Sequence, residues 1–196
     1  MSQGRLNVIS LTSFVETLGE QVALAILRDY SCPQNSEVSD FLHDKALQSA
    51  RLSKSVTYLV SDERNGSILG YFTLMIKPYT VRTNALNSRN RRLFERFAEY
   101  DEEKKTYTVA VYLIAQLGKN FAIDGGRQIT GTQLMELALM KLRASKELVG
   151  GKLVFVERES ALPKLKAFYT AAGFKSWNER YSRKDNVTYD QMFMAL

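Results

Sequence analysis

Two short segments of the sequence combine residue types that could bind a phosphate-containing cofactor and act on it. The first is residues 127–133, Arg-Gln-Ile-Thr-Gly-Thr-Gln, placed between a predicted buried strand and a predicted helix. A glycine in such a turn lets backbone amides approach a phosphate, and the N-terminus of the helix adds partial positive charge. Arg127 adds a fixed charge at the edge of the turn. Many turns between a strand and a helix contain glycine, so an ordinary structural turn is the alternative interpretation.

The second segment is residues 168–174, Phe-Tyr-Thr-Ala-Ala-Gly-Phe, at the end of a predicted helix. An aromatic pair near a helix end more often packs in a core than takes part in catalysis. Its position in the chain changes that balance. A phosphate-binding turn follows one buried strand, and a helix that carries Tyr169 follows the next. Together the two segments are consistent with a single cofactor site.

The residue inventory excludes several classes of enzyme. The chain has one histidine, His43, and one cysteine, Cys32, which cannot build a His/Cys zinc site or an HExxH helix. No G-x-S-x-G turn is present, and no Gly-Lys pair is followed by Ser or Thr as in a Walker A loop. The sequence therefore predicts no metal and excludes serine hydrolases of the nucleophile-elbow type and P-loop enzymes.

The bulk composition predicts a single globular domain, residues 1–196, in the cytoplasm. The chain is 45% hydrophobic and 24% charged, with 11 Gly and 3 Pro. No apolar run approaches the roughly 18 residues of a membrane span, and no signal-peptide pattern opens the chain. A lone cysteine agrees with a reducing compartment. The net charge of +6 favours anionic partners without choosing among nucleotides, nucleic acid and acidic surfaces; we expect no membrane partner.

The elements that would position these segments alternate between strands and helices. Apolar patterning predicts strands at residues 6–11, 56–60, 68–76, 109–117, 153–156, 174–177 and 191–196. It predicts helices at residues 12–30, 39–53, 132–146 and 161–172. This order predicts an α/β fold, with a mixed sheet and helices on its faces. Residues 180–189 are polar and carry no predicted element.

An unusual segment, about residues 77–105, interrupts this order as a basic helical insert. Three arginines share one face of its predicted helix: Arg89, Arg92 and Arg96. Three apolar side chains share another: Leu93, Phe97 and Tyr100. The arginine face suits an acidic protein or a nucleic acid such as tRNA. A solvated amphipathic helix, or the contact of a homodimer, is the alternative.

These features together resemble the GNAT superfamily of acetyltransferases. The likeness covers the strand order across most of the chain and the motifs over about residues 109–174. Residues 128–133 are similar to the family's Q/R-x-x-G-x-G/A pyrophosphate loop, with Gln133 in place of the usual Gly or Ala. Residues 169–174 resemble its Y-x-x-x-G-F signature. The resemblance implies a mostly antiparallel sheet splayed between two central strands, 109–117 and 153–156, with acetyl-CoA in the opening.

The resemblance also implies a role for each candidate residue. The cofactor-binding residues would be Leu117, Gly118, Lys119, Arg127, Gln128, Ile129, Thr130, Gly131, Thr132, Gln133 and Phe168. After a substrate amine attacks the thioester, Tyr169 would protonate the departing thiolate. Glu157 and Glu159 are the carboxylates nearest the cleft in sequence, and either could act as general base through a water. An equally simple interpretation makes them solvated charges.

The expected activity is transfer of an acetyl group from acetyl-CoA to a primary amine. Small-molecule, protein and aminoacyl-tRNA acceptors all stay open, and GNAT toxins that acetylate aminoacyl-tRNA look similar in outline. Two non-catalytic alternatives are a nucleic-acid-binding module and a regulatory protein that binds CoA. Salt-dependent binding of tRNA or DNA without saturable acetyl-CoA binding would indicate the first. Acetyl-CoA binding without thiol release would indicate the second.

Overall fold

The computed structural model describes residues 5–196, which group into two compact units. Within the described residues, the first unit runs to Met75 and resumes over Ile114–Lys141. The second unit comprises Ile76–Leu113 and Leu142–Leu196. Two long strands, β3 (Ile68–Arg82) and β5 (Thr106–Lys119), have residues in both units. The single domain expected over residues 1–196 stays a prediction.

The strands form one mixed, mostly antiparallel sheet. Its order is β1-β2-β3-β5-β6-β8-β7, and β4 pairs with β5 beside this path. All the described pairings are antiparallel except that of β5 with β6, which is parallel. The mixed α/β sheet predicted from the strand order is therefore confirmed.

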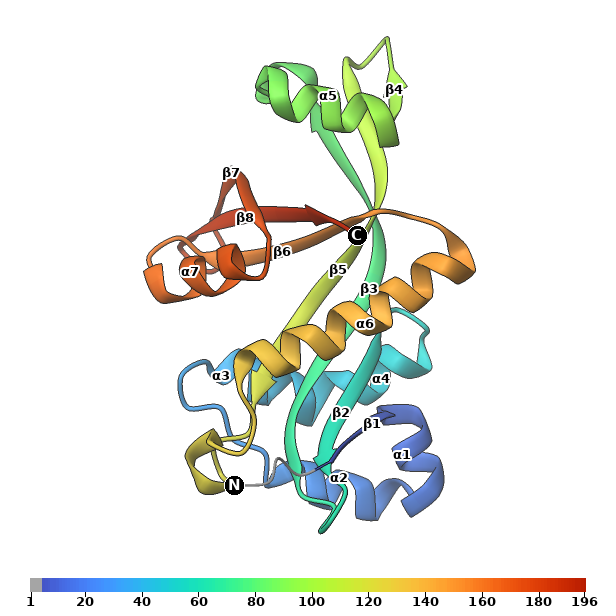
Figure 1. Cartoon of the computed structure of the whole chain (residues 1–196), viewed down its shortest axis with the longest axis vertical. Coiled ribbons are helices and arrows are strands. Elements are labelled where there is room, and N and C mark those ends of the chain that lie inside the picture. The colour runs from blue at the N-terminus through green and yellow to red at the C-terminus, as the bar shows by residue number, and fades with distance from the viewer. Residues whose placement is uncertain (1–4) are drawn as a thin grey trace. The chain divides into compact units, whose positions relative to one another are not determined.

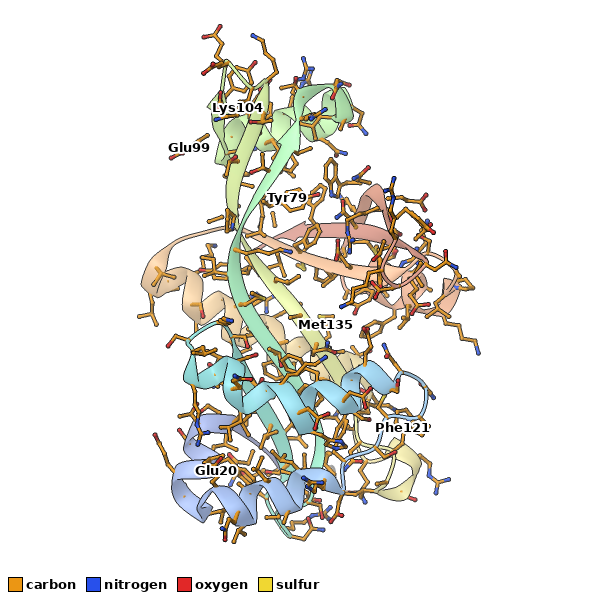
Figure 2. All side chains as sticks on the ribbon, turned by 180° about the vertical axis from the view of Figure 1, so that it is seen from behind. Glu20, Tyr79, Glu99, Lys104, Phe121 and Met135 are labelled. Carbon is orange, nitrogen blue, oxygen red and sulfur yellow. The ribbon has the colours of Figure 1, made fainter. Side chains whose placement is uncertain are left out.

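The first unit contains strands β1 (Leu6–Ser10) and β2 (Val56–Asp62) together with parts of β3 and β5. Its helical elements are α1 (Leu11–Leu18), α2 (Glu20–Arg28), α3 (Ser36–Asp40), a π-helical turn (Phe41–Lys45), α4 (Ala46–Arg51), a 3-10 turn (Asp124–Gly126) and the first part of α6 (Gly131–Val149). In this unit α6 lies on one side of the strands and α3 and α4 on the other (Figures 1 and 2). Buried apolar side chains from α2, α3, α4, β2 and β3 form the core.

The predicted helix over residues 12–30 is two helices. Gly19 separates them, with φ 79° and ψ 149°, a conformation that a non-glycine residue rarely adopts. The apolar spacing that appeared continuous through Leu18, Val22 and Ile26 is therefore interrupted, and these three side chains are exposed. Ala23 and Leu27 of α2 face the core instead.

The second unit contains β4 (Glu99–Asp101), β6 (Leu153–Glu159), β7 (Lys175–Ser182) and β8 (Val187–Ala195). Its helical elements are a 3-10 turn (Thr83–Ala85), α5 (Ser88–Phe97) and α7 (Pro163–Ala171). The helix predicted within the insert is therefore present as α5. It packs chiefly through Phe94, which is buried beside Tyr107 and Trp177, whereas Tyr100 lies in β4 and is exposed.

No element was expected over residues 180–189, but in the structure they form the turn of the β7–β8 hairpin and the strand ends beside it. Ser182 pairs with Val187 and Arg180 with Tyr189, and Asn186 in the turn has a positive φ of 54°. Most β7 side chains are exposed, so no alternation of apolar and polar residues marks the strand. Hydrogen-bonded pairing with β8 across a short turn determines this structure.

Among residues 5–196, no helix has both the length and the apolar character that a membrane crossing requires.

Candidate active site

The two central strands predicted from the sequence pair over only part of their length. The parallel register joins Val111–Leu113 of β5 to Leu153–Phe155 of β6. β5 continues to Lys119, and β6 continues to Glu159 while remaining paired with β8. No β5–β6 pair is described beyond Leu113 and Phe155. Partial pairing is what the predicted splayed sheet requires.

The candidate residues fall into two groups, one in each unit. The first unit holds Leu117, Gly118, Lys119 and the turn of residues 127–133. The second unit holds Glu157, Phe168 and Tyr169. Each group has its own supporting contacts within its unit.

Thr130 and Gln133 form a capping box at the start of α6. The carboxamide oxygen of Gln133 accepts hydrogen bonds from the amide and the hydroxyl of Thr130, at 2.8 and 3.0 Å. In return, the Gln133 amide donates to Thr130 Oγ1 at 3.1 Å. This reciprocal pattern satisfies two amides of the helix N-terminus. The cap gives Gln133 a structural role, and it leaves the amides of Gly131 and Thr132 outside the capping hydrogen bonds.

Replacing Thr130 by alanine should therefore destabilise the protein by about 1 kcal/mol, the usual effect of losing an N-cap. Thr130→Ser keeps the hydroxyl and should restore most of the loss. Urea unfolding of both variants measures the effect. Equal stabilities for the two variants would contradict a capping role for the hydroxyl.

The other side chains of this turn differ in how far they are available to a phosphate. Ile129 is 1% exposed, so only its main chain is available to a ligand. Arg127 is exposed and bonded to Asp124 at 2.5 Å, which compensates part of its charge. Gln128 is exposed.

The loop that leads into the turn is fixed by Asn120, which was not among the predicted site residues. Its buried side chain accepts from the amides of Ser31 and Ala122 and donates to the carbonyl of Ile68 at 2.9 Å. Lys119 Nζ donates to the Gly126 carbonyl at 2.8 Å. An asparagine directly after an apolar strand is common in loops, so the sequence carries no clear signal of this role.

Side chains from the segment that follows α2 pack closely against Gly118. The hydroxyl of Tyr30 donates to the Lys119 carbonyl at 3.1 Å, and Tyr71 donates to the Val38 carbonyl at 2.5 Å. The two tyrosine rings meet edge to face at 5.2 Å. The side chains of Tyr30 and Val38 leave no room for a side chain at Gly118. The position therefore keeps the backbone of β5 close to its neighbours.

Gly118→Ala should destabilise the protein by about 1–3 kcal/mol, the range for overpacking a core. The new Cβ would lie 2.4 Å from Cγ1 of Val38 and 2.6 Å from the hydroxyl oxygen of Tyr30. Urea unfolding would measure the loss. Val38→Ala removes the nearer atom. The loss of stability that Val38→Ala causes should therefore be smaller in the Gly118→Ala background than in the wild type. Additive losses would show that Val38 is not the cause.

In the second unit, the Y-x-x-x-G-F segment has a clear structural logic. α7 ends near Ala171, and Gly173 adopts φ 98°, which turns the chain back. The amide of Phe174 then donates to the Tyr169 carbonyl at 3.0 Å. The buried Phe174 ring meets the Tyr169 ring edge to face at 5.7 Å, and Phe168 packs at 5.2 Å from it. Gly173 and the two phenylalanines therefore hold Tyr169 in place.

Burial raises the pKa of Tyr169 to about 12, while the nearby charge of Arg158 acts in the opposite direction. The phenol consequently keeps its proton throughout the physiological pH range. It can serve as a hydrogen-bond donor or a weak acid.

Glu157 is bound by a network from three other strands. Arg180 donates to both carboxylate oxygens at 3.1 Å, and Gln191 donates at 2.7 Å. Burial alone would raise the pKa of Glu157, but these hydrogen bonds and the charges of Arg180 and Lys77 outweigh it and lower the pKa. Tyr79, labelled in Figure 2, donates to Gln191 Oε1 at 3.0 Å. Glu157 is therefore ionised but weakened as a base, and its catalytic role stays a prediction.

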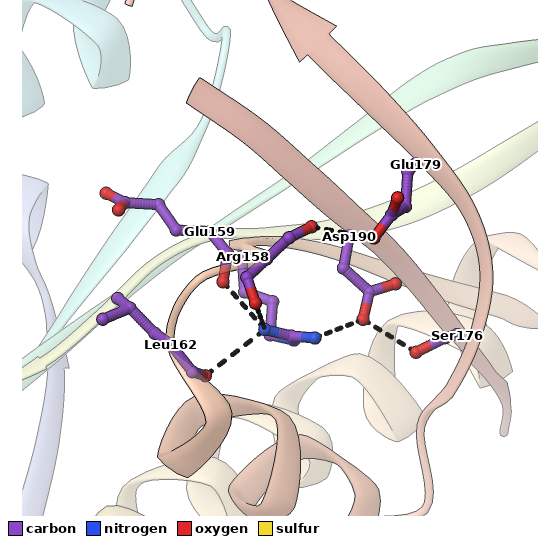
Figure 3. A network of polar contacts seen from close by, with 7 residues as sticks. Arg158, Glu159, Leu162, Ser176, Glu179 and Asp190 are labelled. Atoms are coloured by element: carbon purple, nitrogen blue, oxygen red, sulfur yellow. Dashed lines mark hydrogen bonds and ion pairs between the residues drawn. The ribbon is translucent and has the colours of Figure 1, made fainter. Parts of the chain in front are cut away.

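A buried ion pair supports the turn between β6 and α7 (Figure 3). Arg158 and Asp190 meet at 2.5 Å with side-chain exposures of 3% and 4%, and Ser176 also donates to Asp190. Arg158 donates as well to the carbonyls of Glu159, Ser160 and Leu162, at 2.8–3.3 Å. The pair thus fixes the chain that leads into the helix of Tyr169. No motif in the sequence indicates this pair, although strand alternation places Arg158 on the same side as Val154 and Val156.

Among the described residues, no group of three or more His, Cys, Asp and Glu side chains could hold a metal ion.

Comparisons with known proteins identify the fold. No protein-family model matches the sequence, and no curated protein matches it. Solved structures do match. AtaT complexed with acetyl-methionyl-tRNAfMet superposes with a TM-score of 0.65 at 17% identity, over 97% of this chain and 95% of that chain. A tyrosine-to-phenylalanine mutant of KacT gives 0.66 at 14% identity, over 97% and 95%.

A structure of AtaTR bound with AcCoA gives a TM-score of 0.58 at 16% identity, over 100% of this chain and 94% of that chain. The likeness therefore extends over nearly the full length of both partners in each case. The chain has the fold of AtaT and KacT, which is the GNAT-type fold expected from its motifs.

Proposed function

We propose that this protein is an N-acetyltransferase that moves the acetyl group of acetyl-CoA to a primary amine. The observation that carries the proposal is a fold shared over 97% of the chain with AtaT, which was solved with an acetylated aminoacyl-tRNA. AtaTR, a second match, was solved with AcCoA. The glycine turn before α6 and the tyrosine of α7 supply the chemical groups that such an activity needs.

In the proposed reaction, the first unit binds the cofactor. The amides of Gly131 and Thr132, which the capping box does not use, meet the pyrophosphate, with Gln128 and Ile129 contributing main-chain groups. Arg127 stands at the rim. Main-chain groups of Leu117, Gly118 and Lys119 bind the pantetheine arm and the acetyl carbonyl, as the resemblance implies.

The second unit supplies the groups for the transfer itself. The substrate amine attacks the thioester carbonyl, the carbon–sulfur bond breaks, and Tyr169 donates to the sulfur that leaves. Phe168 packs beside Tyr169. Glu157 accepts the amine's proton through a water. Much of the rate enhancement comes from holding the amine next to the thioester.

The state of Glu157 favours an acceptor with a weakly basic amine. An α-amino group titrates near about 7.7–8.0 and a lysine near about 10.4. At neutral pH a useful fraction of α-amino groups is already uncharged, so a weakened base is enough. Together with the arginines of α5, this favours an α-amine carried by an anionic macromolecule. Aminoacyl-tRNA is the first candidate, and the N-terminus of an acidic protein is the second.

Arg92 and Arg96 of α5 are exposed and available for such an acceptor. The side chain of Arg89, the third arginine of the predicted face, lies outside the described residues.

A thiol-release screen tests the proposed activity. Purified protein and acetyl-CoA are mixed in turn with polyamines, lysine peptides, peptides with free α-amines, and aminoacyl-tRNA. We expect enzyme-dependent release of CoA thiol, fastest with aminoacyl-tRNA. Calorimetric binding of acetyl-CoA without release for any amine would indicate the regulatory alternative. Salt-sensitive tRNA binding without acetyl-CoA binding would indicate a nucleic-acid-binding module.

A further inference from the structure

Two hollows in the second unit are lined by cations and by no carboxylate. The larger part of their surroundings comes from one segment, residues 77–107, which we call the arm. It includes the end of β3, α5, β4 and the start of β5 (Figure 1). All residues that line the two hollows belong to the second unit.

The first hollow lies between α5 and the hairpin of β7 and β8, with a volume of about 540 Å³. Arg92 and Arg96 line it from α5, and Lys175 from the start of β7. Amide and hydroxyl side chains, those of Asn90 and Ser176 among them, also line it. All three cations are exposed to solvent.

The second hollow lies where β3 ends and β5 begins, with a volume of about 630 Å³. Its lining consists of Arg82, Lys104 and Lys105 with the polar side chains of Thr83, Asn84 and Thr106. Lys104 also bonds to Asp101 at 2.8 Å, so part of its charge is compensated. No apolar residue lines this hollow.

This chemistry matches the backbone of a nucleic acid better than an acidic protein. Phosphate oxygens are bound mostly by Arg and Lys, with Ser, Thr and Asn beside them. Protein–protein contacts usually depend on buried aromatic or aliphatic anchors, and the second hollow offers none. Arg92 and Arg96 are one helical turn apart, about 6 Å along the axis, which suits neighbouring phosphates of one strand.

We propose that the arm and the start of β7 bind the sugar–phosphate backbone of an RNA acceptor, through both hollows and independently of base sequence. The inference rests on the proposed function for the identity of the acceptor. Contacts to phosphates position the nucleic acid without reading its bases. The arm therefore orients the RNA, and discrimination among amines depends on other parts of the protein.

Binding of tRNA to the full-length protein tests this arrangement. Fluorescence anisotropy at several salt concentrations compares the wild type with three triple variants. One removes the first hollow's cations (Arg92→Ala, Arg96→Ala, Lys175→Ala). A second removes those of the other hollow (Arg82→Ala, Lys104→Ala, Lys105→Ala). The matched control removes three exposed cations of the first unit (Arg28→Ala, Lys45→Ala, Lys54→Ala).

We expect each hollow variant to weaken tRNA binding by about 10–100-fold near 0.15 M salt and to reduce the salt slope by about 2, as the loss of two or three phosphate contacts requires. The control has the same net charge and should change the affinity by less than about threefold. All the replaced side chains are exposed, so unfolding midpoints should match the wild type and verify the fold. Equal weakening in all three variants would overturn the assignment to the arm.

Two further measurements separate this inference from the proposed function. Unrelated RNA of equal length should compete with tRNA, and polyglutamate should compete poorly; the reverse order would overturn the choice of RNA. In thiol-release assays, the hollow variants should raise the KM for aminoacyl-tRNA while leaving transfer to a small amino acid ester unchanged. If no acceptor is acetylated but RNA binding falls as expected, the proposed function fails and RNA binding by the arm stands. If the hollow variants bind RNA normally and still transfer the acetyl group, RNA binding by the arm is refuted and the proposed function stands.

Discussion

Replacing Tyr169 by phenylalanine is expected to slow acetyl transfer by about 10²–10³-fold while leaving acetyl-CoA affinity within a few-fold of the wild type. The range is that for losing one donor to a charge that develops in the transition state. A phenol with a pKa near 12 is a weaker acid than a thiol of pKa about 8.5. We therefore expect Tyr169 to stabilise the developing thiolate mainly by a hydrogen bond, which places the effect at the lower end for acid catalysis.

Steady-state thiol release measures the rate, and calorimetry measures the binding of acetyl-CoA. Tyr181→Phe is the matched control, because this tyrosine is exposed on β7 and donates to Asn186. The pH profile adds a second readout. Since burial raises the pKa of Tyr169 to about 12, its titration should cause no loss of activity between pH 7 and 10. A turnover for Tyr169→Phe within threefold of the wild type would remove this residue from the mechanism.

The elements that the sequence predicted correctly are those whose signals are local. The apolar runs of β5 and β6 are continuous, and the glycine turn before α6 follows from its position between a strand and a helix. The Y-x-x-x-G-F segment was recognisable because its contacts are also local. Gly173 supplies the positive φ that ends the helix, and Phe174 packs against Tyr169. The contact of Gln133, unusual at its position in the turn, is also local, because this side chain caps α6 through Thr130, three residues away.

The remaining features depend on contacts between distant parts of the chain. Tyr79, Glu157, Arg180 and Gln191 come from four different strands, so no spacing in the sequence relates them. Strand β7, which contains Arg180, is exposed over most of its length and lacks the alternation by which strands are predicted. Glu157 could be named as a candidate base from its position after an apolar run. Its weakened basicity could not be predicted, because it depends on side chains from other strands.

Removing one partner of the buried pair of Arg158 and Asp190 should strongly destabilise the second unit. Asp190→Asn leaves the arginine 3% exposed with no compensating charge, so we expect a loss of about 3–5 kcal/mol by urea unfolding. The exposed pair of Arg51 and Glu20 has the same 2.5 Å separation and provides the control. Because solvent screens it, Glu20→Gln should cost less than about 1 kcal/mol.

A double variant separates the charge from its positioning role. Arg158→Met with Asp190→Leu removes both charges and should recover much of the lost stability, since buried pairs are often replaceable by apolar residues. It also removes the donors to the carbonyls of Glu159, Ser160 and Leu162, which fix the chain before α7. Stability should therefore return while turnover stays low and acetyl-CoA affinity is retained. If turnover recovers together with stability, the turn before α7 does not need Arg158, and the pair serves the fold alone.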